Sequence, residues 1–348
     1  MFHKVLWLHN WKQSKFAILA MWIVIFFSIP FDYLTLVTRN YEQRADGFMD
    51  PIYYGKGFSL IAPLAITIVL ALFAAFLLNG KRNNGSLKFQ FSLPFSRKEL
   101  FLAKWFFGAV HILLALIGNI IITIITIQTS FIRNYEDISH WPMYFLFASF
   151  AYVGIYSVCL FVGTFTGRII SQVLLSFLLL FIGQTAVMLI RPFIQVLLQK
   201  PDPEFYIDSF HLINITTLPT MMYEYHFWNT STYDGSNPTD PLSYFKVEYP
   251  SYDTLIAATI ITGLSIFIGS FIFSRNKLER NGQFLLFKKL EPFYIALITV
   301  IVALVGGALS NGSSYLYFLY FFGFGIVMFF ILRLLFKRNS RFLSQQST

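Results

Sequence analysis

Long apolar runs alternate with short charged segments along the whole chain. A transmembrane helix needs about 20 predominantly apolar residues, and six separate runs reach or approach that length. A seventh run, 292–332, contains no charge and is too long for one span, but Asn311–Ser314 interrupts it with residues typical of a turn. The pattern predicts an all-α polytopic membrane protein with about eight transmembrane helices. The predicted spans are Phe16–Phe31 continuing to about Val37, Gly57–Gly80, Trp105–Ile132, Trp141–Thr166, Ile169–Ile190, Thr254–Phe273 and two within Pro292–Leu332.

The amino-acid composition also indicates a membrane protein. Hydrophobic residues make up 56% of the 348 positions, phenylalanine alone occupies 42, and only 12% of the residues are charged. Soluble domains usually carry about 25% charged residues. The chain therefore has more apolar surface than one water-soluble core can bury, and a lipid bilayer is the surroundings that its composition favours.

The distribution of positive charge predicts the orientation. With an even number of spans both termini lie on one side, and placing them in the cytosol puts 19 Lys and Arg residues inside and 7 outside. Cytosolic loops of membrane proteins carry such an excess of basic residues. The same choice leaves three acidic residues inside and 14 outside. We therefore expect a multi-pass protein with cytoplasmic N and C termini.

The spans divide the chain into membrane and solvent segments. Residues 1–15 place Trp7 and Trp11 among lysines, which fits an amphipathic helix on the inner leaflet. The long outer loop is rich in aromatic residues, unlike a disordered loop, and its prolines disfavour long helices, so a small folded cap is expected. The predicted segments are the interfacial helix 1–15, spans one to five in 16–191 with a cytosolic loop at 80–104, an extracellular cap at 192–253, spans six to eight in 254–336 with a cytosolic loop at 274–291, and a cytosolic tail at 337–348.

Motifs of common catalytic sites are missing from the sequence. Gly55–Lys56 and Gly80–Lys81 lack the upstream glycine and the following Ser or Thr of a Walker A loop. The chain also contains no G-x-S-x-G or H-E-x-x-H motif. We therefore expect a chain that is not an enzyme, with no catalytic residue, cofactor or metal of its own.

Ionisable side chains are nearly absent from the predicted spans. Asp32, near the outer end of the first span, and His111, near the inner end of the third, are interpreted as structural. Ion-coupled carriers normally keep buried carboxylates as a relay, so a secondary transporter is not expected. Glu224 and His226 with His211 match no metal-ligand spacing, and the single cysteine, Cys159, lies in an apolar run where packing is its expected role.

The loop 80–104 contains a signal for the start of a helix. Ser96 is followed three residues later by Glu99, which is the pattern of a capping box, and Pro94 stands just before it. A short, basic, amphipathic helix is therefore predicted to begin at Arg97 and to run into the third span.

A resemblance to a known family rests on this segment. Leu93–Lys98, which reads Leu-Pro-Phe-Ser-Arg-Lys and is followed by Leu100 and Lys104, resembles the first cytosolic loop of ABC-2 type permeases. Trp11–Lys15 and Glu279–Gly282 are similar to the acetoin-utilisation permease branch of Gram-positive bacteria. The resemblance implies a coupling loop whose short helix docks on a cytosolic ATPase. The residues implied for ATPase coupling are Leu93, Pro94, Phe95, Ser96, Arg97, Lys98, Glu99 and Lys104, with Glu279, Arg280, Asn281 and Gly282 as a second contact.

The function implied by this resemblance is that of the membrane-spanning subunit of an ABC-type transporter in a bacterial cell membrane. Phe95 and Leu100 would enter a cleft of the ATPase, and Arg97 and Lys98 would pair with acidic residues there. A second copy or a paralogue would complete the permease, and the partner ATPases would bind ATP and Mg²⁺. Their work would move a hydrophobic or amphipathic compound, an antimicrobial agent or a small metabolite, and no nucleic acid is expected as a partner.

Two other classes stay open on the sequence alone. A multi-span enzyme acting on a lipid-linked substrate would need polar catalytic residues near an interface, and Glu224–His226 is the candidate region. An immunity or sensor protein of the membrane would bind a ligand without moving it.

Overall fold

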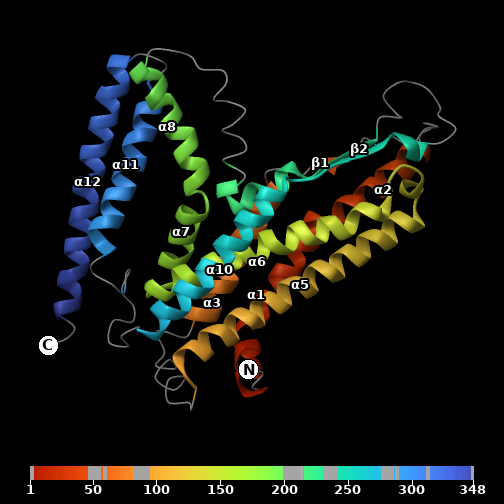
Figure 1. The fold of residues 1–348 in the computed structure, drawn as a ribbon, viewed down its shortest axis with the longest axis horizontal. Coiled ribbons are helices and arrows are strands. Elements are labelled where there is room, and N and C mark those ends of the chain that lie inside the picture. Colours follow the sequence, from red (N-terminus) through yellow and green to blue (C-terminus); the bar gives the residue numbers. More distant parts are fainter. Residues whose placement is uncertain are drawn as a thin grey trace. The chain divides into compact units, whose positions relative to one another are not determined.

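The computed structural model describes residues 4–45, 56–57, 61–80, 95–198, 213, 215–229, 241–275, 286, 290–310 and 314–345. Nearly all of them are helical (Figure 1). Seven described helices are long and apolar enough to cross a membrane, and an eighth span results if the broken pair α7 (Ile169–Leu180) and α8 (Ile182–Leu198) counts as one. The chain is therefore an all-α, multi-pass membrane protein, which confirms the fold class predicted from hydropathy.

The chain forms two compact units. Unit 1 is Met1–Leu180 with Leu218–Phe284, and unit 2 is Phe181–Thr217 with Leu285–Thr348. The helices of unit 1 are α1 (Lys4–Ser28), α2 (Pro30–Ala45), α3 (Ile61–Asn79), α5 (Arg97–Thr129), α6 (Trp141–Phe165), α7 and α10 (Tyr252–Ser274). Its short elements are the 3-10 helices η2 (Phe131–Asn134), η3 (Ile138–His140), η4 (Leu218–Glu224) and η5 (Pro241–Tyr244) and the strands β1 (Lys56–Gly57), β2 (His226–Asn229) and β3 (Phe245–Glu248). Unit 2 contains α8, α11 (Glu291–Ala308) and α12 (Ser314–Gln345).

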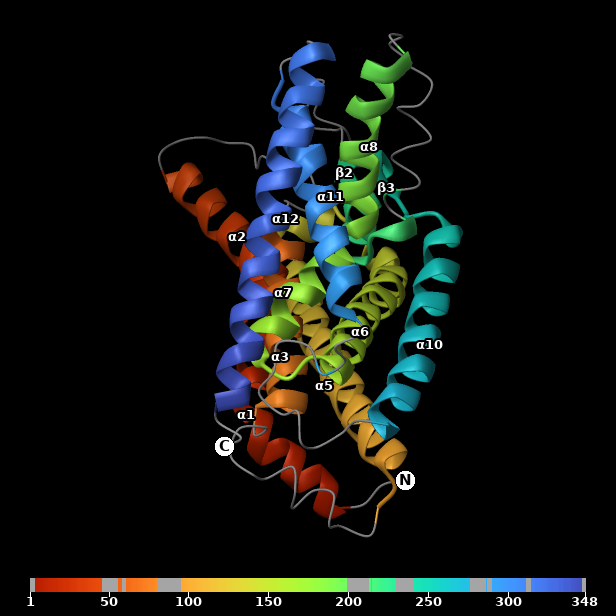
Figure 2. The same ribbon diagram turned by 90° about the vertical axis from the view of Figure 1, so that its left-hand side faces the viewer.

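Helices α3 and α6 form the centre of unit 1. Every residue from Gly154 to Leu160 of α6 is buried, as are Leu70 and Phe73 of α3. Helices α5, α7 and α10 pack on α6, and α1 packs on α3 and α5 (Figure 2). The outer helices expose large apolar side chains, such as Phe16 of α1 at 75% and Phe267 of α10 at 74%. Such faces suit contact with lipid tails, which are as apolar as these side chains.

Helix α1 contains both the predicted interfacial segment 1–15 and the start of the first span. It runs without a break from Lys4 to Ser28, a stretch that contains neither Gly nor Pro. One buried stripe follows its whole length at helical spacing, and Asn10, Ser14 and Ile18 belong to it. The N-terminal segment is therefore continuous with the helix of the first span, and the helix boundary expected at residue 15 is corrected. Its position at the inner leaflet stays a prediction.

At two prolines, Pro30 and Pro192, the helices differ from the predicted spans. Pro30 begins α2 after a turn at Ile29, so the predicted continuation of the first span lies in a second helix. Pro192, expected to begin the outer loop, lies inside α8, which continues to Leu198. The fifth predicted span breaks instead at Phe181.

A neighbouring segment of unit 2 accounts for the start of α8 at this break. The backbone N–H of Gln184 donates to Oγ1 of Thr217 at 3.0 Å, which satisfies one of the amides that a helix start leaves without an intrahelical partner. A Cβ atom on Gly183 would lie 2.2 Å from Oγ1 of Thr216. Glycine at 183 therefore allows residues 216 and 217 to approach the first turn of α8.

The cap of unit 1 consists of residues 218–229 and 241–251. Strand β2 pairs with β1 on one side and with β3 on the other, both antiparallel, and Phe227 lies opposite Lys56. Helix η4 packs on α6 and α3 and buries Leu218–Met222. Within the described residues the cap contains only short elements, as its prolines predict.

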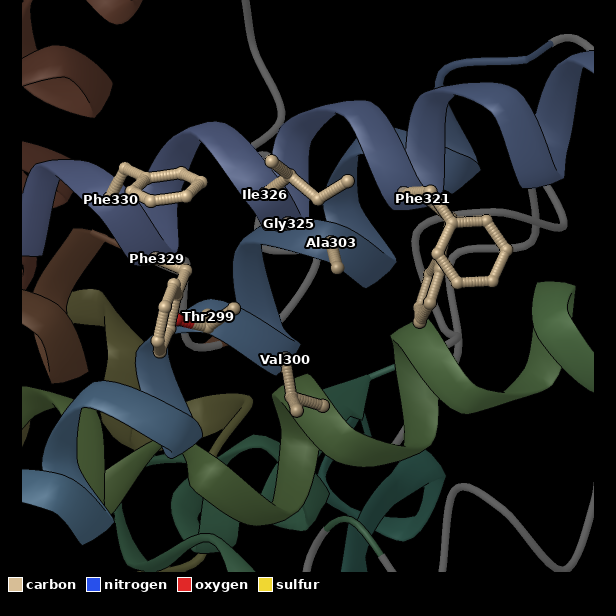
Figure 3. A pocket seen from close by; sticks show the side chains of 9 residues that line it. Thr299, Val300, Ala303, Phe321, Gly325, Ile326, Phe329 and Phe330 are labelled. Atoms are coloured by element: carbon tan, nitrogen blue, oxygen red, sulfur yellow. The ribbon is translucent and has the colours of Figure 1, made fainter.

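Unit 2 holds the last apolar run as two packed helices. Helix α11 ends at Ala308 and α12 begins at Ser314, on either side of the predicted turn. Helix α12 continues to Gln345, past the expected end of the last span at residue 336, because no Gly or Pro interrupts this stretch. An apolar groove of about 280 Å³ lies along the two helices (Figure 3). The groove is lined by Thr299, Val300, Ala303, Phe321, Phe322, Gly325, Ile326, Phe329 and Phe330.

Candidate functional site

The start of α5 carries the predicted capping box. Ser96 has an extended backbone, and its Oγ accepts a hydrogen bond from the backbone N–H of Glu99 at 3.2 Å. The Glu99 carboxylate accepts in return from the backbone N–H of Ser96 at 2.8 Å. The helix begins at Arg97, so the capping box and the helix start expected from the sequence are confirmed.

We expect Ser96→Ala to destabilise the first turn of α5 by about 1 kcal/mol, because alanine offers no oxygen to the Glu99 amide. Hydrogen exchange of the amides of residues 97–100 measures the effect as a loss of protection. Ser96→Asp keeps an acceptor at the N-cap and should leave protection unchanged. Equal loss in both variants would contradict the capping role.

The predicted coupling residues around this cap differ in exposure. Lys98 and Glu99 are exposed, and Phe95 is half-buried. Arg97 is half-buried and donates from Nη1 to the backbone carbonyl of Ser274, at the end of α10, at 3.3 Å. Leu100 is only 3% exposed within unit 1, so the expected insertion of Leu100 into a partner's cleft is corrected.

Lys104 is also buried rather than displayed. Only 4% of Lys104 is exposed, and its Nζ donates to the Leu77 carbonyl at 2.6 Å. The side-chain amide of Gln13 donates to the Phe76 carbonyl at 2.6 Å and to the Leu77 carbonyl at 3.2 Å. These carbonyls lie in the last turn of α3, where a helix leaves acceptors unsatisfied and favours positive charge. Lys104 therefore anchors the end of α3, and its placement on a docking surface is wrong.

More side-chain bonds join the helices at this end of unit 1, called here the Ser96 end. The Tyr156 hydroxyl of α6 donates to the Lys104 carbonyl at 2.8 Å. The Asn79 amide of α3 donates to Gln172 of α7 at 2.6 Å, and Gln172 donates to the Cys159 carbonyl of α6 at 2.8 Å. Helices α3, α5, α6, α7 and α10 are therefore connected by polar bonds around the start of α5.

Several predicted coupling residues lie outside the described residues. Leu93 and Pro94 precede the described start of this segment at residue 95. The second contact, Glu279, Arg280, Asn281 and Gly282, falls in the range 276–285. Their assignment stays a prediction.

A second polar cluster, which the sequence reasoning missed, lies at the opposite end of α5. Glu136 and His140 are 2% and 1% exposed. The Tyr33 hydroxyl of α2 donates to the two carboxylate oxygens of Glu136 at 3.0 and 3.1 Å, and Trp141 Nε1 donates at 3.3 Å. His140 Nε2 lies 3.1 Å from Oε1 of the same carboxylate. The Glu136 cluster is Tyr33, Glu136, His140, Trp141 and Tyr225.

Tyr225 connects the cap to this cluster. Its hydroxyl lies 2.8 Å from Nδ1 of His140 and 2.9 Å from the His140 carbonyl oxygen. Burial raises the pKa of the Tyr225 hydroxyl well above its usual value, so the hydroxyl keeps its proton at any physiological pH. A further hydrogen bond joins the cap to the same region, because the Asn229 side-chain amide donates to the Tyr135 backbone carbonyl at 2.7 Å.

A faint signal for this cluster exists in the sequence. Glu136 and His140 are spaced four residues apart, immediately before Trp141 and a predicted span, but in the sequence Glu136 is one of many acidic residues on the predicted outer side.

The two ionisable residues expected near the spans have structural surroundings. Asp32 lies in the first turn of α2 and is exposed. His111 packs against the rings of Trp7, Trp11 and Phe107 at centroid distances of 5.6, 5.5 and 4.5 Å.

Among the described residues, no three His, Cys, Asp or Glu side chains lie together as the ligands of a metal ion would. Glu224 instead accepts from the Ser251 backbone N–H at 3.4 Å, and His226 pairs with Glu248 in the sheet register. His211 lies outside the described range. In comparisons with known proteins, no family model, no curated protein and no solved structure matches the chain.

Proposed function

We propose that the chain is the membrane-spanning subunit of an ABC-type transporter and that the start of α5 is the docking element for a cytosolic ATPase. The observation that carries the proposal is the capped helix start. It presents the exposed side chains of Lys98 and Glu99, while Arg97 and Lys104 in the same two turns bond to the ends of α10 and α3.

This arrangement suits the transmission of force. A helix end held by a capping box has a well-defined structure, and its hydrogen bonds reach three neighbouring helices of unit 1, α3, α6 and α10. Packed helices shift as rigid bodies between discrete arrangements rather than deforming continuously. Closure of a docked ATPase would therefore move the helices of the Ser96 end together.

The charge pattern supports the side on which this element lies. The segments assigned to the cytosol hold 19 of the 26 basic residues, which suits a bacterial cell membrane with both termini inside. A second copy or a paralogue would complete the permease. ATP and Mg²⁺ would be bound by the ATPases, and a hydrophobic or amphipathic compound, an antimicrobial agent or a small metabolite would be moved.

Lys98→Glu is expected to weaken co-purification of the full chain with the cytosolic ATPase proposed as its partner, because the exposed charge that would meet an acidic partner surface is reversed. Lys12→Glu is the matched control, since Lys12 is an exposed lysine of α1 on the same predicted side. ATPase capture should fall at least tenfold in the first variant and stay unchanged in the second. Capture that survives Lys98→Glu, or turnover of a lipid-linked substrate by the chain alone, would contradict the proposal.

A further inference from the structure

The hydrogen atoms of the Glu136 cluster allow two arrangements. The Tyr225 hydroxyl has one proton and faces two groups of His140, the backbone carbonyl oxygen and Nδ1. A carbonyl oxygen only accepts, whereas Nδ1 accepts or donates according to the protonation of the ring. If Tyr225 donates to the carbonyl, Nδ1 must carry a proton and donate to Tyr225. If Tyr225 donates to Nδ1, the carbonyl loses this bond.

The other ring nitrogen decides the charge of each arrangement. His140 Nε2 faces the Glu136 carboxylate, which also accepts from Tyr33 and Trp141. An ionised carboxylate only accepts, so with Glu136 ionised Nε2 carries a proton in both arrangements. The first arrangement is therefore an imidazolium paired with a carboxylate, and the second contains a neutral imidazole. They differ by one proton on Nδ1.

We propose that Glu136 and His140 form a proton-binding site that latches the β2–β3 part of the cap onto the ends of α2 and α6. With the proton bound, Tyr225 is held by two hydrogen bonds to one residue, and without it by one. The cap is therefore held more strongly when the proton is bound, at low pH, than when the proton is lost at higher pH. This inference is independent of the proposed transport function.

The surroundings transmit the change to the sheet. The His140 ring lies 4.9 Å from the Phe227 ring of β2 and 5.5 Å from the Phe245 ring of β3, measured between centroids. A charge that appears or disappears beneath these two rings acts directly on both strands. Helix η4, in contrast, is fixed by its burial against α6, so the response is expected in β2 and β3.

Other titratable groups share this region and define the variants that are needed. Hydrogen bonds from Ser139 lower the pKa of Asp137, with a smaller contribution from His140, so Asp137 stays ionised throughout the range tested. Burial raises the pKa of Tyr249, which therefore stays neutral. Titratable or charged residues on the described elements around the pair include Tyr33, Lys56, Asp137, Tyr144, Tyr225, His226, Lys246, Glu248 and Tyr249.

The test is hydrogen exchange of the full chain in lipid nanodiscs at about pH 5 and about pH 8, with each rate divided by that of the unfolded peptide at the same pH. Protection of residues 225–229 and 245–248 should fall on the order of fivefold from the lower to the higher pH, the value of one hydrogen bond. Tyr225→Phe keeps the ring and removes the hydroxyl. It should show the lower protection at both pH values.

Two further measurements keep the result decisive. His226→Gln removes a neighbouring histidine from β2 and should keep the pH response of the wild type. In the wild-type protein, ¹⁵N-histidine spectra assigned by difference from His140→Gln should show two protonated ring nitrogens at about pH 5 and one at about pH 8. The proposal is overturned by an unchanged His140 ring, by a flat exchange profile in the wild type, or by a pH response that persists in Tyr225→Phe.

Discussion

Gly108→Ala is expected to destabilise unit 1 by about 1–3 kcal/mol, the usual cost of overpacking a filled core. A Cβ atom at position 108 of α5 would lie 2.1 Å from both Cζ and Oη of Tyr156. Tyr156 has no room to move, because it is fully buried and its ring stacks on the Phe73 ring at a centroid distance of 5.4 Å. Its hydroxyl also donates a hydrogen bond to the Lys104 carbonyl. The close approach of α5 and α6 at the Ser96 end therefore requires a residue without a side chain.

Gly263→Ala is the matched control for this change. Gly263 lies inside α10, and a Cβ atom there would meet no heavy atom within 4 Å. Because alanine favours a helix over glycine by up to about 1 kcal/mol, this variant should be neutral or stabilised. Unfolding in a mixed-detergent titration measures both variants against the wild type. Equal stability of the Gly108 and Gly263 variants would contradict the packing of Tyr156 against α5.

The contacts that were predictable from the sequence join residues close together in the chain, and the contacts that were missed join residues far apart in the chain. The Ser96–Glu99 capping box was predictable because all of its atoms belong to four consecutive residues. The bond from Lys104 to the Leu77 carbonyl joins residues 27 apart, and the bond of His140 to Tyr225 joins residues 85 apart. Neither pairing has a local signal, since each depends on which helices become neighbours.

The same limit applies to α1. The sequence predicts an amphipathic helix on the inner leaflet over residues 1–15 but does not specify which of its positions pack on the protein. The structure buries Asn10 and Ser14, while Val5 and Leu8 are 65% and 48% exposed. In a bilayer an exposed apolar side chain costs nothing, and a small polar residue finds partners in the interior, where the Ser14 hydroxyl donates to the Asn10 carbonyl at 2.7 Å. Periodicity located the helix but not the side that packs.

Lys104→Glu is expected to prevent accumulation of the folded protein, whereas Lys98→Glu leaves stability within about 0.5 kcal/mol of the wild type. The two lysines are six residues apart on one helix and are alike in the sequence. Lys104 is buried against the carbonyls that end α3, where a carboxylate would face acceptors and the negative end of the helix dipole. A buried carboxylate that faces carbonyl oxygens has neither a hydrogen-bond donor nor an opposite charge there, and burial of such a charge costs several kcal/mol.

Lys98 has no such burial, so its replacement changes only the surface offered to a partner. Two readouts therefore separate two roles that the sequence assigns together. The yield of monodisperse protein and its detergent unfolding midpoint report anchoring of α3, and co-purification of the ATPase reports docking. If Lys104→Glu folds as well as Lys98→Glu, the buried anchor is contradicted while docking remains to be judged by capture. If Lys98→Glu folds and still captures the ATPase, the docking role fails although the fold stands, because the stability of α5 depends on Lys104 and not on Lys98.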